Sequence, residues 1–194
     1  ICKMTQDKAL EFLGLAEKLK CTVWHSWTSS GRRESVAEHV FRLMVFAWLV
    51  KDEFPECDPY RVMELALFHD MGEAVTGDIP AFEKTKEDRK KEEDTYELIA
   101  DLLPEPEKSR LGEIFRELSE GKTPEARLVK AMDKLEAVIR HNEADISTWL
   151  PLEYELQLTY GKEQADGILW MKKMRERVCK DALEKIEREG KDKD

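Results

Sequence analysis

Adjacent histidine and aspartate residues, His69 and Asp70, follow an apolar stretch near the middle of the chain. Val62 and Leu65 precede His69 by seven and four residues, so a helix through this stretch places all three on one face. An imidazole and a carboxylate are then directed toward the core, where an unpaired charge is very costly. A bound metal cation would compensate for that cost.

Two other apolar helical faces each contain a side chain that can bind a metal. His39 lies three residues after Val36 and four before Leu43, and Asp133 lies four residues after Val129. With the adjacent pair, they give two imidazoles and two carboxylates, a set suited to Mn, Fe, Co, Ni or Zn, and to Mg with more water. We therefore predict a site for one divalent metal, with coordination positions left for water and substrate.

Each of these residues also has an ordinary structural interpretation. By itself, His39 fits a hydrogen-bonded core histidine, and Asp133 fits a partner for the neighbouring Lys130 or Lys134. The joint pattern favours a metal site, but spacing alone leaves the two interpretations about equal.

Composition restricts the class of protein and its partners. The 194 residues fit one domain with a substantial core, and only 9 Gly and 7 Pro leave few turn signals. The net charge of −10 argues against a nucleic-acid or anionic-membrane surface, so neither partner is expected. Four scattered cysteines, with neither a signal peptide nor an apolar run of about 18 residues, predict a cytoplasmic protein.

Hydrophobic periodicity predicts an all-α fold. The expected helices cover residues 5–20, 35–53, 59–71, 107–120, 124–143 and 162–188, with another ending before Pro104 and a short one within 145–161. We predict one domain over 1–194, with a core of about 5–143, C-terminal helices over 145–188 and a frayed tail at 189–194.

Local signals refine two of these segments. Residues 21–33 lack a sustained period and are expected to form a loop. Ser35 and Glu38 resemble a capping box that opens the helix over 35–53, and Asp58 is the expected N-cap of the next helix. The buried stripe expected on the helix over 35–53 comprises Val36, Val40, Leu43, Met44, Ala47 and Trp48.

The order His39, His69-Asp70 and Asp133 on successive helices resembles the HD-domain superfamily of metal-dependent phosphohydrolases. Two segments resemble more narrowly the branch that contains bacterial 5'-deoxynucleotidases and their eukaryotic relatives: Arg32-x-Glu34-Ser35-Val36-Ala37-Glu38-His39 and His69-Asp70-x-x-Glu73-x-x-Thr76-Gly77-Asp78-Ile79-Pro80. The resemblance runs from about the first helix to Ile139 and implies a single helical HD domain, often assembled as a homodimer.

The resemblance also implies residue roles. The ligands of one divalent metal would be His39, His69, Asp70 and Asp133. Glu73 would act as general base or proton shuttle for the attacking water, although by itself it also fits a first-turn carboxylate. Asp78 would help to hold the sugar or the water, and would line the nucleotide pocket with Ile79, Pro80 and Ala81. The reaction would cleave a nucleoside 5'-monophosphate to nucleoside and inorganic phosphate.

One departure from the family concerns substrate binding. The deoxynucleotidases supply an Arg-Trp pair that orients the phosphate and disfavours a ribose 2'-hydroxyl, and the ungapped positions here are Trp24 and His25. Arg32 is the expected substitute for the arginine, with Arg33 and Lys20 as further candidates. Trp24 or Trp27 either forms the aromatic wall of the pocket or covers the junction of the first two helices. Deoxy-versus-ribo selectivity therefore stays open.

Two alternatives accompany this function. The same metal site would serve a nucleotide pyrophosphohydrolase or a phosphodiesterase. A non-catalytic nucleotide-binding protein is the other alternative, and the presence of Glu73 and Asp78 beside all four ligands disfavours it.

Overall fold

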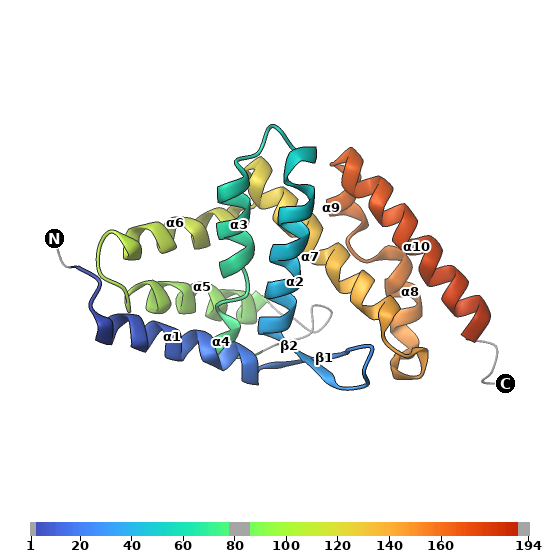
Figure 1. The fold of residues 1–194 in the computed structure, drawn as a ribbon, viewed down its shortest axis with the longest axis horizontal. Helices are drawn as coiled ribbons and strands as arrows, with labels where there is room; N and C mark the ends of the chain where they lie inside the picture. The colour runs from blue at the N-terminus through green and yellow to red at the C-terminus, as the bar shows by residue number, and fades with distance from the viewer. Residues whose placement is uncertain (1–2, 78–85, 190–194) are drawn as a thin grey trace.

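Three helices meet at the centre of the molecule: α2 (Val36–Val50), α3 (Pro59–Phe68) and α7 (Pro124–Glu143) (Figure 1). Each buries an apolar face against the other two, and Leu43, Leu65 and Met132 are fully buried between them. The computed structural model describes residues 3–77 and 86–189, in which helices predominate. The predicted all-α fold is therefore confirmed.

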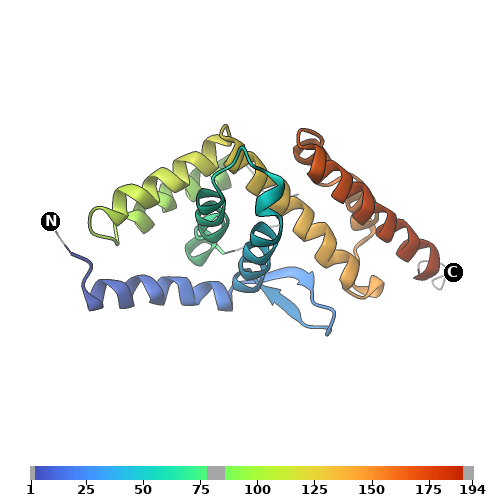
Figure 2. The same ribbon diagram turned by 45° about the horizontal axis from the view of Figure 1, so that its top comes forward.

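The other helices pack around this centre. In Figure 1, α1 (Gln6–Cys21), α5 (Lys86–Ala100) and α6 (Glu107–Glu120) lie on one side of it, and the C-terminal helices lie on the other, along α7. Those helices are α8 (Pro151–Thr159), α9 (Lys162–Asp166) and α10 (Leu169–Glu189). Short helices complete the chain: η1 (Lys51–Glu53), α4 (Glu73–Thr76) and η2 (Ile146–Thr148). Figure 2 shows α10 lying alongside α7 from a second direction.

The start of α2 is fixed by the predicted capping box. The Ser35 hydroxyl accepts from the Glu38 backbone N–H, and the Glu38 carboxylate accepts from the Ser35 backbone N–H at 2.9 Å. A hydrogen bond from Arg32, together with the one from Ser35, lowers the pKa of Glu38 to about 2. Asp58 caps α3 as predicted, because its carboxylate accepts from the Tyr60 backbone N–H at 2.9 Å.

The segment predicted as a loop over 21–33 is instead mostly a β-hairpin. Strands β1 (Val23–Trp27) and β2 (Arg33–Ser35) pair antiparallel, with a register irregularity between Val23 and Trp27. Its sequence, Val-Trp-His-Ser-Trp followed by Thr-Ser-Ser-Gly, places strand-forming residues before a turn. Gly31 has a φ of 79° in that turn, a conformation that glycine adopts without strain.

Three further expectations were wrong in detail. The helix predicted over 162–188 is divided into α9 and α10 at Gly167. Helix α3 ends at Phe68, so His69 and Asp70 lie in the turn that follows it. Trp48, expected in the buried stripe of α2, is 57% exposed.

Within residues 3–77 and 86–189, no helix is long and apolar enough to cross a bilayer.

We predict that Ser35→Ala lowers the free energy of unfolding by about 1 kcal/mol, because the first turn of α2 loses its side-chain cap. Urea unfolding followed by circular dichroism measures this change. Ser109→Ala is the control, since Ser109 is exposed on the surface of α6. Equal stability of Ser35→Ala and the control would show that the cap is not needed.

Candidate metal centre

The structure brings the four predicted ligands together from three segments. His39 lies in the first turns of α2, His69 and Asp70 lie in the turn after α3, and Asp133 lies in the middle of α7. His39 is fully buried, and the other three side chains are largely covered. The packing of α2, α3 and α7 on one another therefore also assembles this group.

Three separations between ligand atoms are typical of one coordination shell, and two others are longer, at 3.7 Å for His39 Nε2 to Asp70 Oδ2 and 3.9 Å for His69 Nε2 to Asp133 Oδ1. His39 Nε2 and His69 Nε2 are 3.2 Å apart, Asp70 Oδ2 is 3.0 Å from His69 Nε2, and Asp133 Oδ1 is 3.4 Å from His39 Nε2. Two ligands at about 2.1 Å from one ion are about 3.0 to 3.4 Å apart in octahedral or tetrahedral geometry. In the described residues, the ligand atoms of His39, His69 and Asp70 all lie within 4.8 Å of one another.

Hydrogen bonds hold both imidazoles with Nε2 toward the centre. His39 Nδ1 lies 2.5 Å from Glu136 Oε2, and His69 Nδ1 lies 2.8 Å from the Ala66 carbonyl oxygen. A carbonyl oxygen can only accept, so His69 Nδ1 carries the proton. A neutral His69 then presents its Nε2 lone pair to the centre, and a proton on His39 Nδ1 gives His39 the same orientation. These partners are of the kind that orient metal-bound histidines.

Two observations indicate that the centre favours a positive charge. Asp70 Oδ2 is buried and has no hydrogen-bond partner among the described residues, although it faces the ring nitrogen of His69. Burial opposes a charge on His39, but the carboxylates of Asp133 and Glu136 outweigh it and raise the pKa of His39 to about 10. Nitrogen and oxygen donors around such a position fit a divalent cation.

Trp24 of the hairpin connects this group to Glu73. Its indole N–H donates to Glu73 Oε2 at 3.2 Å, and its ring centroid lies 4.4 Å from that of His39. The Arg140 guanidinium lies over the Trp24 ring at 4.1 Å and forms an ion pair with Glu34 at 2.7 Å. Two roles were left open for Trp24: a wall of the pocket or a cover for the junction of the first two helices. Its position beside the predicted metal ligands and the predicted base favours the first role.

The remaining predicted substrate-binding residues have other partners or are not described. Arg32 is exposed and binds Glu38, and His25 Nε2 lies 2.8 Å from Glu153 Oε1 of α8. The guanidinium of Arg33 lies over the Trp27 ring at 4.3 Å. Four predicted residues fall outside the described part of the chain: Asp78, Ile79, Pro80 and Ala81.

Sequence reasoning missed one residue of the centre, Glu136, and considered Lys134 only as a partner of Asp133. Glu136 is almost fully buried and lies three residues after Asp133, so its position in the apolar seam of α7 was a usable signal. Lys134 Nζ lies 3.3 Å from Asp133 Oδ2, which is the pairing expected from the ordinary interpretation of Asp133. The two interpretations of Asp133 are compatible, because its other oxygen faces His39.

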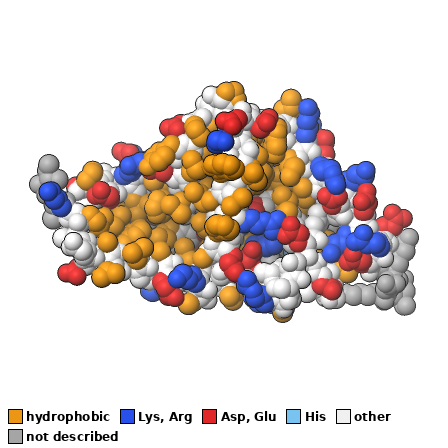
Figure 3. Space-filling model, in the orientation of Figure 1, with side chains coloured by type: hydrophobic (Ala, Val, Ile, Leu, Met, Phe, Trp, Pro, Cys, Tyr) orange, Lys and Arg blue, Asp and Glu red, His pale blue; other side chains and the backbone are white. Residues whose placement is uncertain are grey.

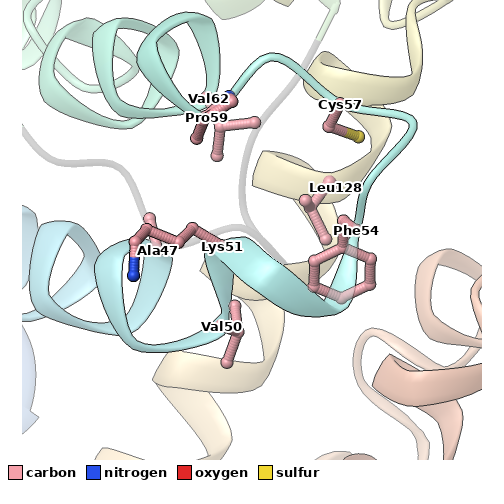
Figure 4. Close-up of a pocket in the computed structure, with 8 residues that line it drawn as sticks. All are labelled: Ala47, Val50, Lys51, Phe54, Cys57, Pro59, Val62 and Leu128. Atoms are coloured by element: carbon pink, nitrogen blue, oxygen red, sulfur yellow. The ribbon is translucent and has the colours of Figure 1, made fainter.

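A small apolar pocket lies elsewhere, at the far end of α2. Its lining comes from α2, η1, α3, α7 and the segment between η1 and α3: Ala47, Val50, Lys51, Phe54, Cys57, Pro59, Val62 and Leu128 (Figure 4). Ala47 is eight residues from His39, about 12 Å along the helix. The pocket is too far from the predicted metal ligands, and too apolar apart from Lys51, to bind a substrate of the metal centre.

Comparisons with known proteins agree with this arrangement. A sequence profile of the family described as HD domain matches residues 16–174. The human 5'-deoxynucleotidase HDDC2 is 36% identical over 138 residues, which cover 69% of this chain and 67% of that protein. The 5'-deoxynucleotidase hdd1 of Schizosaccharomyces pombe is 29% identical over 156 residues, covering 71% of this chain and 78% of that protein.

Solved structures share the fold. A protein described as a predicted metal-dependent phosphohydrolase, from Magnetospirillum magnetotacticum, superposes with a TM-score of 0.72 at 21% identity. The match covers 92% of this chain and 95% of that one, and at this identity it is evidence for the fold alone. A conserved hypothetical protein from Pyrococcus furiosus gives a TM-score of 0.64 at 26% identity over 87% of this chain and 98% of that one.

We predict that Glu136→Ala weakens metal binding by about 10- to 100-fold, because His39 Nδ1 loses the carboxylate that orients the ring. Titration calorimetry with Mn²⁺ or Co²⁺ measures the affinity. Glu136→Gln should lose less, since the amide oxygen still accepts a hydrogen bond. Glu113→Ala is the control, because Glu113 is an exposed carboxylate on α6. A folded Glu136→Ala protein with unchanged affinity would contradict the prediction.

Proposed function

The chain belongs to the HD domain family, and we propose that it removes the 5'-phosphate from deoxynucleoside and nucleoside monophosphates. It is a phosphoric monoester hydrolase that acts on a small nucleotide. The observation that carries the proposal is the buried convergence of His39, His69 and Asp70 with Glu73 held beside them. Relatives that are 29% to 36% identical to this chain over the aligned residues are named 5'-deoxynucleotidases, which supports the choice of substrate.

The proposed ligands of one divalent metal are His39, His69, Asp70 and Asp133. When bound, such a cation neutralises phosphate charge and lowers the pKa of the attacking water. The hydrogen bonds from His39 to Glu136 and from His69 to Ala66 keep both imidazoles in place during turnover. The donor set suits Mn, Fe, Co, Ni and Zn, and Mg with more water in its shell.

Glu73 is the proposed general base. Its carboxylate takes the proton of the water that attacks phosphorus. The bond between phosphorus and the ester oxygen breaks, and that oxygen leaves as the 5'-hydroxyl of the nucleoside after taking up a proton, which Glu73 can return. The Trp24 indole N–H fixes the orientation of this carboxylate, and the Trp24 ring packs against His39. We place Asp78 and the following Ile79, Pro80 and Ala81 at the nucleotide, as the family resemblance implies.

The test of the function is phosphate release from a panel of ribo- and deoxyribonucleoside 5'-monophosphates with Mn, Co, Mg or chelator. We expect metal-dependent release of inorganic phosphate that chelator abolishes. Release from deoxynucleotides alone would show that selectivity survives without the usual Arg-Trp pair. No release with any metal, together with turnover of nucleoside diphosphates or cyclic nucleotides, would overturn the assignment.

Glu73→Gln and His69→Ala separate proton transfer from metal binding. We predict that Glu73→Gln lowers kcat by about 10²- to 10⁴-fold with metal content unchanged, because an amide cannot accept the proton. His69→Ala should lose metal and activity together. Elemental analysis beside steady-state kinetics distinguishes the two variants. Full activity of Glu73→Gln would remove the base assignment, and full metal content in His69→Ala would contradict the ligand set.

A homodimer is the proposed assembly. Figure 3 shows hydrophobic side chains gathered over α1, α2 and α3 on one face of the molecule. On α2, Phe41, Trp48 and Leu49 are 71%, 57% and 66% exposed, which is unusual for large apolar side chains on one helix. The aromatic residues of the C-terminal helices offer less exposed surface for a dimer interface, since Trp149 is buried and Trp170 packs on Phe54.

We predict that Phe41→Glu combined with Trp48→Glu converts a dimer to a monomer, because two charges would be buried at the interface. Size-exclusion chromatography with light scattering measures the mass. Leu183→Glu is the control, since Leu183 is an exposed apolar residue on α10. A monomeric wild-type protein would contradict the proposed assembly.

A further inference from the structure

A phosphate monoester needs a positively charged partner, and the arginines expected for this role have other partners. Arg32 binds Glu38 at the surface, and Arg33 lies over the Trp27 ring. Arg140 is held in a buried ion pair. None of these contacts directs a guanidinium to the metal ligands.

Lys134 is a cation that does lie beside those ligands. Its Nζ is 3.3 Å from Asp133 Oδ2. The other oxygen of the same carboxylate, Asp133 Oδ1, is 3.4 Å from His39 Nε2 and 3.9 Å from His69 Nε2. A single carboxylate therefore joins the ammonium group to the candidate metal centre.

The C-terminal helices hold the Lys134 side chain in this position. Only 25% of the side chain is exposed, and its Nζ lies over the Tyr160 ring, 5.0 Å from the centroid. Gly161 follows with a φ of 70°, and a Cβ at this glycine would lie 2.6 Å from the Cβ of Lys134. The backbone before α9 therefore packs directly on the Cβ end of the Lys134 side chain, while Tyr160 contacts its ammonium group.

We propose that Lys134 donates a hydrogen bond to a phosphoryl oxygen of the substrate, replacing the arginine that the family supplies from its loop. The ammonium group has three N–H donors, so it can bind Asp133 and a phosphate oxygen together. Pairing with Asp133 alone accounts for the same contact, and binding of phosphate distinguishes the two roles. This inference rests on the proposed function only for the identity of the substrate.

The test measures binding of inorganic phosphate to the Mn²⁺-loaded protein by titration calorimetry, beside metal content and steady-state kinetics. We expect Lys134→Met to weaken phosphate binding at least tenfold, as loss of a charged hydrogen bond implies, and to raise KM for the nucleotide. Metal content should not change. Lys134→Arg, which keeps the charge, should recover part of the affinity. Lys130→Met is the matched control, because Lys130 is exposed one turn earlier on α7.

Several results would overturn the inference. These are absence of phosphate binding to the wild-type protein, equal affinity in folded Lys134→Met, and an equal loss in Lys130→Met. Loss of metal together with phosphate in both Lys134 variants would assign Lys134 to Asp133 alone. The proposed function can fail independently of this inference. If the protein hydrolyses no nucleotide but binds phosphate through Lys134, the nucleotidase activity is refuted and the anion-binding role of Lys134 is retained.

Discussion

The hydrogen bond between His39 and Glu136 is the interaction on which the rest of the centre depends. Both side chains are almost fully buried, and a carboxylate in that environment is costly unless it is paired. The bond joins α2 to α7, two helices that are far apart in the sequence. It also sets the direction of His39 Nε2, toward which His69 and the two aspartates converge. The same hydrogen bond thus holds α2 against α7 and orients His39 toward the other candidate ligands.

The sequence predicted the parts of this site that repeat with helical spacing. His39 and Asp133 each interrupt an apolar helical face, and the helix period was enough to direct both inward. His69 points to the same centre from the turn just after α3. Glu136 also interrupts the apolar face of α7, but nothing in the sequence indicates that its partner is His39. The contact of Trp24 with Glu73 spans 49 residues, and the spacing of residues in the sequence says nothing about such a pairing. Hydrophobic periodicity also did not reveal the hairpin. Strand β1 has five residues, too few for an alternating apolar and polar pattern to stand out from the adjoining turn.

The hairpin shows how a departure from a family pattern can be absorbed. It places Trp24 between Glu73, the proposed base, and His39, a proposed metal ligand. Arg140 supports the ring from α7 and is itself neutralised by Glu34. A position where the family resemblance implies an arginine thus carries an aromatic ring that contacts Glu73 and His39, and the ammonium group beside Asp133 comes from Lys134 of α7.

Gly161 has a consequence for how this protein can change over evolutionary time. The motifs that resemble the deoxynucleotidases lie before Ile139, whereas the match to the HD domain family extends to residue 174 and so includes Gly161. A side chain at Gly161 would collide with Lys134 and would also have to adopt a left-handed backbone conformation. Substitutions at this glycine should therefore be selected against, because they would disturb α7 next to Asp133.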